Sequence, residues 1–166
     1  MNTPPLSLEE RRALLKRLNA VQGYLHLGME MDAWNELENT PAEQRGRPEV
    51  LKIRADVSRS MKKWELVVEI TRHLAKIEPN DPRHPVNLAA ATRKIAGEQD
   101  AADILEQARS TFPNDAVLAY NLACYRAVLG RVDEAKKLLA EAVRLDSSLR
   151  PHSLDDPDLA VLWDSI

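Results

Sequence analysis

The sequence predicts an all-α protein built from repeated pairs of helices. Three observations lead to this prediction. Ala, Leu, Glu, Arg and Lys, which favour helices, dominate a chain of 166 residues with only five glycines. Apolar residues recur at helical spacing and do not alternate as they would in a strand. The same pattern returns every 34 residues, which indicates stacked copies of one structural unit.

A ladder of small residues shows the repeat most directly. Ala33, Val67, Ala101 and Ala135 follow one another at intervals of 34 residues, without insertion or deletion. Small side chains at such positions allow two helices to pack closely where they cross. The ladder divides the chain into four units followed by a tail, at residues 14–47, 48–81, 82–115, 116–149 and 150–166.

The first two units depart most from the repeating pattern. Ser7 with Glu10 is typical of a capping box, so we expect the long first helix to begin there. The second helix of the first unit should end before Thr40, because Pro41 follows it. Gly28 suits the turn between this pair of helices, but Lys62 stands at the same position of the second unit.

The last two units are more regular. Asp81 and Asp115, each in a Pro-Asn-Asp sequence, are predicted to cap the first helices of these units. Gly130 marks the turn within the fourth unit. In the tail, Leu159, Leu162 and Trp163 share one face of a short helix predicted after Pro157. We expect this face to cover the end of the core.

The fourth unit resembles a tetratricopeptide repeat over its whole length. Leu122, Ala123, Gly130, Ala135, Leu139 and Ala142 lie where that family has its signature small and apolar residues. The resemblance covers residues 14–149, and the tail is similar to a segment that closes some bacterial arrays. It implies an αα-superhelix (TPR solenoid) with about four helix-turn-helix repeats and a short C-terminal capping helix, as a single domain over residues 1–166.

The resemblance also implies a function. Proteins of this family bind a peptide or protein segment in a concave groove that the first helix of each pair lines, and they do so without catalysis. Asn87 and Asn121 are expected to hold the backbone of an extended peptide, the alternative being that each bonds within its own neighbourhood or faces water. The full set of expected binding residues is Lys52, Asp56, Arg83, Asn87, Arg93, Lys94, Tyr120 and Asn121.

The four basic residues of this set, Lys52, Arg83, Arg93 and Lys94, suit an acidic ligand or, alternatively, a solvated surface. The carboxylate clamp that grips the C-terminus of heat-shock chaperones is not expected. Lys52 and Asn87 match two of its five places, and the other three differ.

Other classes of function are disfavoured. A net charge of −3 argues against a nucleic-acid partner. The four histidines lack the spacing of a metal site, and no phosphate-binding loop occurs, so we predict no cofactor and no enzyme. Asp155, Asp156 and Asp158 are interpreted as charges at a helix start rather than as cation ligands. Cys124 is interpreted as a structural residue.

A single cysteine, with neither a signal peptide nor a membrane span evident, favours a soluble cytoplasmic protein. Two alternative functions remain open at this stage. One is a self-associating structural subunit, for example a homodimer, for which an apolar patch of Leu15, Leu18 and Leu25 would be suited. A small chaperone for an unfolded or secreted client is the other.

Overall fold

The computed structural model describes residues 4–163, and within this range it contains helices and turns but no strand. The chain divides into two compact units, the first ending at Glu78 and the second starting at Pro79. The expectation of a single domain over residues 1–166 stays a prediction. The all-α fold class is confirmed.

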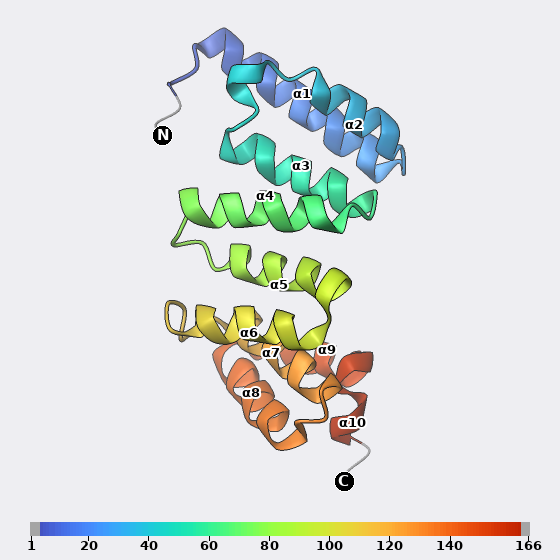
Figure 1. Ribbon diagram of the computed structural model, residues 1–166, viewed down its shortest axis with the longest axis vertical. Helices are drawn as coiled ribbons and strands as arrows, with labels where there is room; N and C mark the ends of the chain where they lie inside the picture. The colour runs from blue at the N-terminus through green and yellow to red at the C-terminus, as the bar shows by residue number, and fades with distance from the viewer. Residues whose placement is uncertain (1–3, 164–166) are drawn as a thin grey trace. The chain divides into compact units, whose positions relative to one another are not determined.

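The first unit consists of two pairs of helices and a short 3-10 turn (Figure 1). Its elements are α1 (Leu8–His26), α2 (Glu30–Glu38), η1 (Ala42–Gln44), α3 (Pro48–Ser60) and α4 (Trp64–Ile77). The predicted capping box opens α1. The backbone N–H of Glu10 donates to Ser7 Oγ at 3.2 Å, and the N–H of Ser7 donates to Glu10 Oε2 at 2.8 Å. Helix α2 ends before Thr40, as predicted.

Close helix packing explains the ladder of small residues. Ala33, Val67, Ala101 and Ala135 are all fully buried, one in the second helix of each pair. In the first unit, Ala33 and Leu37 of α2 pack against apolar side chains of α1 and α3, among them Leu18. A larger side chain at a ladder position would therefore separate its helix from its neighbour.

The turns within the pairs use the left-handed backbone conformation. Gly28 and Gly130 have φ angles of 68° and 75°. Lys62, which stands at the corresponding position between α3 and α4, has a φ of 57°. The turn therefore keeps its shape there although a Cβ makes this conformation unfavourable.

The second unit consists of two further pairs and the tail (Figure 1). Its elements are α5 (Arg83–Ala96), α6 (Glu98–Arg109), α7 (Ala116–Val128), α8 (Val132–Leu145), α9 (Leu149–Asp155), η2 (Pro157–Leu159) and α10 (Ala160–Trp163). Asp115 caps α7 as predicted, because its carboxylate accepts from the N–H of Leu118 at 2.7 Å. The expectation for Asp81 is wrong in detail. Its carboxylate accepts from the N–H of Arg83, the first helical residue, and Pro82 occupies the capping position.

The tail closes the core of the second unit. Leu159 and Leu162 are fully buried in the same apolar cluster as Leu122 of α7 and Leu139 of α8. The tail is more structured than the sequence predicts, because α9 precedes the short helical segment that starts at Pro157. Among the described residues, no helix is both long and apolar enough to cross a membrane.

Candidate functional site

The first helices of the two pairs in the second unit, α5 and α7, carry six of the eight residues expected to bind a ligand. Helical spacing places Val86, Asn87 and Arg93 on one face of α5, and Val117, Tyr120 and Cys124 on one face of α7. We refer to these two faces together as the α5–α7 surface. Its two halves differ, since one contains an open pocket and the other is covered by the tail.

The open half is a pocket at the N-terminal ends of the two helices. Its volume is about 260 Å³, and its lining consists of Pro82, Arg83, Val86, Asn87, Asp115 and Val117. The side chain of Asn87 is half-buried and has no hydrogen-bond partner among the described residues. A carboxamide both donates and accepts, so this pocket offers a free polar group beside an apolar space.

Arg83 lies at the edge of this pocket and is strongly exposed. Its guanidinium donates to both carboxylate oxygens of Asp81, with Nε–Oδ1 and Nη2–Oδ2 distances of 2.8 and 2.6 Å. These bonds hold the pKa of Asp81 well below its usual range. Part of the positive charge of Arg83 is therefore already neutralised at the edge of the pocket.

The covered half holds the tail segment 156–159 through side-chain contacts. The Tyr120 hydroxyl donates to Asp156 Oδ2 at 2.8 Å, and Cys124 Sγ lies 3.6 Å from the same oxygen. Burial, followed by the hydrogen bond to Asp156, raises the pKa of Tyr120. Burial likewise raises the pKa of the Cys124 thiol. Asp156 therefore faces two protonated groups.

Arg93 binds the other carboxylate of this segment. Its Nη1 and Nη2 donate to the two oxygens of Asp158 at 2.5 and 2.9 Å, and its Nε donates to Glu98 at 3.2 Å. The guanidinium also lies over the ring of Tyr125, with its central carbon 5.4 Å from the ring centroid. Pairing with Asp158 raises the pKa of Arg93, and burial raises that of Tyr125 to about 12.

The remaining two expected residues on these helices behave differently. Asn121 donates its amide to the carbonyl of Val117, one turn back in α7, at 2.8 Å. Lys94 is exposed and has no partner among the described residues. Neither residue lines the pocket.

Lys52 and Asp56 lie on α3 in the first unit. The Lys52 ammonium pairs with Glu78 at 2.9 Å, and Asp56 accepts from Arg59 at 3.2 Å. Partial burial raises the pKa of Asp56, although Arg59 acts in the opposite sense. Both charges are thus balanced by neighbours within the unit.

Sequence reasoning missed Asp156 and Asp158 as members of the site. Asp156 does act at a helix start, since it accepts from the N–H of Asp158 at 3.0 Å. Its second oxygen and the carboxylate of Asp158 reach α7 and α5. No local sequence pattern predicts the contact between Arg93 and Asp158, because the two residues are 65 positions apart.

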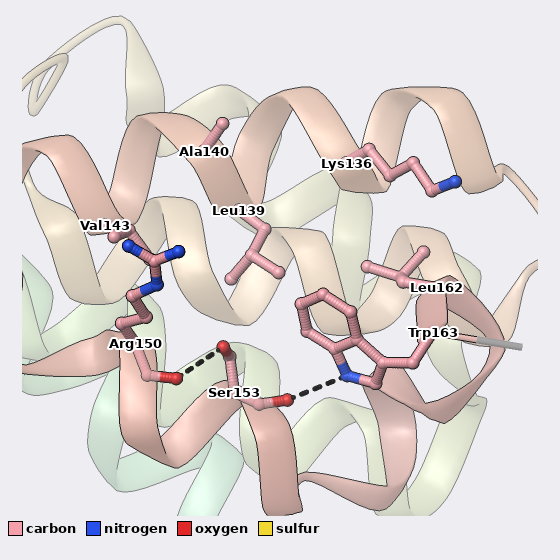
Figure 2. Close-up of a pocket in the computed structure, with 8 residues that line it drawn as sticks. All are labelled: Lys136, Leu139, Ala140, Val143, Arg150, Ser153, Leu162 and Trp163. Carbon is pink, nitrogen blue, oxygen red and sulfur yellow. Dashed lines mark hydrogen bonds between the residues drawn. The ribbon is translucent and has the colours of Figure 1, made fainter. Parts of the chain in front are cut away.

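A second cleft lies between α8 and the tail, with a volume of about 350 Å³. Figure 2 shows its lining, which consists of Lys136, Leu139, Ala140, Val143, Arg150, Ser153, Leu162 and Trp163. The indole N–H of Trp163 donates to the carbonyl of Ser153 at 3.2 Å. The tail is thus held against α8 around an incompletely filled apolar space.

Solved structures of MamA, a tetratricopeptide-repeat protein, resemble this chain over most of its length. MamA 41-end from Desulfovibrio magneticus RS-1 has a TM-score of 0.67 and 18% identity, covering 96% of this chain and 92% of that chain. A further crystal structure of MamA has a TM-score of 0.67 and 13% identity, covering 86% and 87%. MamA MSR-1 C2 has a TM-score of 0.64 and 20% identity, covering 80% and 76%.

The chain folds as a tetratricopeptide-repeat array. The expected resemblance and the solenoid fold class are thereby confirmed. The sequence matches no protein-family model, and no curated protein matches it. The likeness to MamA is one of fold, and an array of this fold serves many functions. The function of this array is therefore argued from its site.

Proposed function

We propose that this tetratricopeptide-repeat array is a non-catalytic protein-interaction module, and that its α5–α7 surface binds a peptide or protein segment. The observation that carries the proposal is the pocket beside Asn87. A volume of about 260 Å³ suits a single apolar side chain, and Val86 and Val117 supply apolar walls. The Asn87 carboxamide would hold the adjoining peptide unit, because it can donate to the carbonyl and accept from the N–H.

The chemistry of Cys124 supports a binding role over a catalytic one. This cysteine is buried, and its raised pKa keeps it as a thiol. A nucleophilic cysteine needs the opposite shift, which stabilises the thiolate.

The proposal is tested by affinity capture from native lysate with two variants of the pocket. Asn87→Ala removes the carboxamide, and Val117→Glu places a charge at the apolar wall. Both positions lie on the surface of the array, so melting temperatures should match that of the natural chain. Asn35→Ala, an exposed asparagine on α2, is the matched control.

A partner captured by the natural chain and by Asn35→Ala, but lost with both pocket variants, supports the proposal. Retention of the same partner by both pocket variants overturns it, since the contact must then lie elsewhere on the array.

Self-association is a second candidate, favoured by exposed apolar side chains in the first unit. Leu15 is 50% exposed on α1, and Leu8, Leu27 and Met31 are also exposed. Leu18, expected on the same patch, is instead buried in the core. Light scattering over a range of concentrations tests this candidate. A homodimer that Leu15→Glu dissociates would support it, and a concentration-independent monomer would exclude it.

A further inference from the structure

The tail segment Asp156-Pro157-Asp158-Leu159 lies on the α5–α7 surface in the manner of a bound peptide. Tyr120 donates to the first carboxylate, Arg93 binds the second at two points, and Leu159 is fully buried. Three of its four side chains are therefore recognised by chemical type. The two carboxylates meet donors, and the leucine meets the apolar core.

From these contacts, we propose that the α5–α7 surface is a recognition site for acidic segments of a partner protein. Such a segment carries two carboxylates two positions apart, followed by an apolar residue. The tail occupies this site as an internal ligand, and a partner segment of the same chemistry displaces it. The inference rests on the proposed function and names the chemistry of the partner.

The shape of the segment depends on few residues outside it. Asp156 accepts from the N–H of Asp158 through its side chain, and from the N–H of Leu159 through its carbonyl, both at 3.0 Å. Pro157 lacks an N–H and fixes its own φ, so it favours the same turn. A separate chain with this pattern can therefore adopt the bound conformation without the rest of the tail.

Several apolar side chains in the remainder of the tail are only partly buried. Leu154 is 62% exposed, and Val161 and Trp163 are 41% and 36% exposed. The cleft of about 350 Å³ lies beside Trp163, between the tail and α8 (Figure 2). Apart from Leu159 and Leu162, the apolar side chains named here are thus incompletely covered, which favours exchange of the segment that contacts Arg93 and Tyr120.

The positive charge of Arg93 determines which partner segments can replace the tail. Among the described residues, the hydrogen-bond partners of the Arg93 side chain are the carboxylates of Asp158 and Glu98. Its guanidinium lies over the ring of Tyr125, and both terminal nitrogens donate to Asp158. Guanidinium groups bind carboxylates at two points better than they bind neutral groups. A partner segment with amides in place of the carboxylates should therefore not displace the tail.

The test uses the full chain and a fluorescein-labelled peptide with the sequence of residues 152–163, followed by fluorescence anisotropy. The natural chain should bind this peptide weakly, because its own tail competes. Asp156→Asn with Asp158→Asn weakens the internal ligand, so the peptide should bind about tenfold or more tightly. Asp155→Asn, an exposed neighbour without a partner among the described residues, should leave binding unchanged.

Two further measurements define the site. Adding Arg93→Gln to the double variant should abolish binding, and a peptide with asparagines at the two acidic positions should not bind. Circular dichroism checks that each variant is folded. If the double variant loses its helical signal, the single variant Asp158→Asn replaces it, because it weakens the binding of the tail by removing only one carboxylate.

The proposal is overturned if the peptide fails to bind a folded variant whose tail has become sensitive to protease, since the tail is then only a cap. It is also overturned if the natural chain forms dimers that Asp158→Asn abolishes, because the occupant is then the tail of a second copy. These outcomes leave the proposed function testable by itself. Affinity capture with Asn87→Ala and Val117→Glu reports on the open pocket, whereas the anisotropy of the acidic peptide in Arg93→Gln reports on the half that the tail covers.

Discussion

Arg93 and Asp158, 65 positions apart in the sequence, form a two-point ion pair that joins α5 to the tail. Both side chains are about three-quarters buried, at 25% and 27% exposure, so the pair is shielded from solvent more than an ordinary surface pair. It places a carboxylate of the tail on a residue that the sequence analysis left open between an acidic ligand and a solvated surface. The same pair therefore links the stability of the tail to the availability of the α5–α7 surface.

Replacing Asp158 by asparagine should destabilise the array. The guanidinium of Arg93 would lose one of its two charged partners while remaining partly buried, at a cost of about 1–2 kcal/mol in the free energy of unfolding. Urea unfolding followed by circular dichroism measures this change. Asp155→Asn removes a carboxylate from the same acidic run without breaking a described contact. Equal midpoints for the two variants would show that the ion pair contributes nothing.

The stability of the second unit should decrease in alkali. The pKa values of Tyr120 and Tyr125 are raised by burial, that of Tyr125 to about 12. The folded chain therefore binds both phenolic protons more tightly than the unfolded chain, whose phenols titrate near their usual value of about 10. This contribution is complete below pH of about 10 and is lost as the pH rises towards 12.

Ultraviolet absorbance of the phenolate tests this expectation in a Tyr24→Phe background, where Tyr120 and Tyr125 are the remaining tyrosines. Both should titrate above the usual value in the folded chain and at that value in urea. Titration at the usual value in the folded chain would contradict the packing of both rings.

The sequence predicts the helices better than it predicts the site, for a physical reason. Periodicity and capping are local, so the burial of Ala33 and Ala135 and the cap at Asp115 follow from residues close in the chain. The contacts of Asp156 and Asp158 are not local. They depend on how the tail crosses α7 and α5, and no spacing in the sequence specifies that path.

Asparagines that look equivalent in the sequence also diverge in the structure. Asn87 and Asn121 are one repeat apart, yet Asn121 bonds the carbonyl of Val117 whereas Asn87 faces a pocket. Which partner a carboxamide selects depends on the space around it, and the pocket forms only where α5 meets the start of α7. The repeat predicts the position of each asparagine on its helix but not its partner.

Replacing Lys62 by glycine should stabilise the array. Lys62 has a φ of 57° at the turn where Gly28 and Gly130 stand in other pairs. Removing the Cβ relieves the strain, and part of that gain is offset by the larger entropy of glycine in the unfolded chain. We expect the free energy of unfolding to rise by about 0.5–1 kcal/mol.

Lys62→Ala is the matched control for this variant, because it shortens the exposed side chain but keeps the Cβ. Chemical denaturation should detect a gain for glycine and none for alanine. An equal gain for both would assign the effect to the lysine side chain rather than to the backbone.

Replacing Ala135 by leucine should overpack the contact between α7 and α8. Ala135 is fully buried, and close helix crossings leave no room for three additional carbons. The expected cost is about 1–3 kcal/mol in the free energy of unfolding. Ala140→Leu, five residues further along the same helix, is the matched control, because Ala140 is exposed at the edge of the cleft beside the tail. Thermal melts of the two variants separate the effects of volume at a helix crossing from those of leucine on a helix surface. If Ala135→Leu and Ala140→Leu have the same melting temperature, the ladder of small residues does not mark the helix crossings.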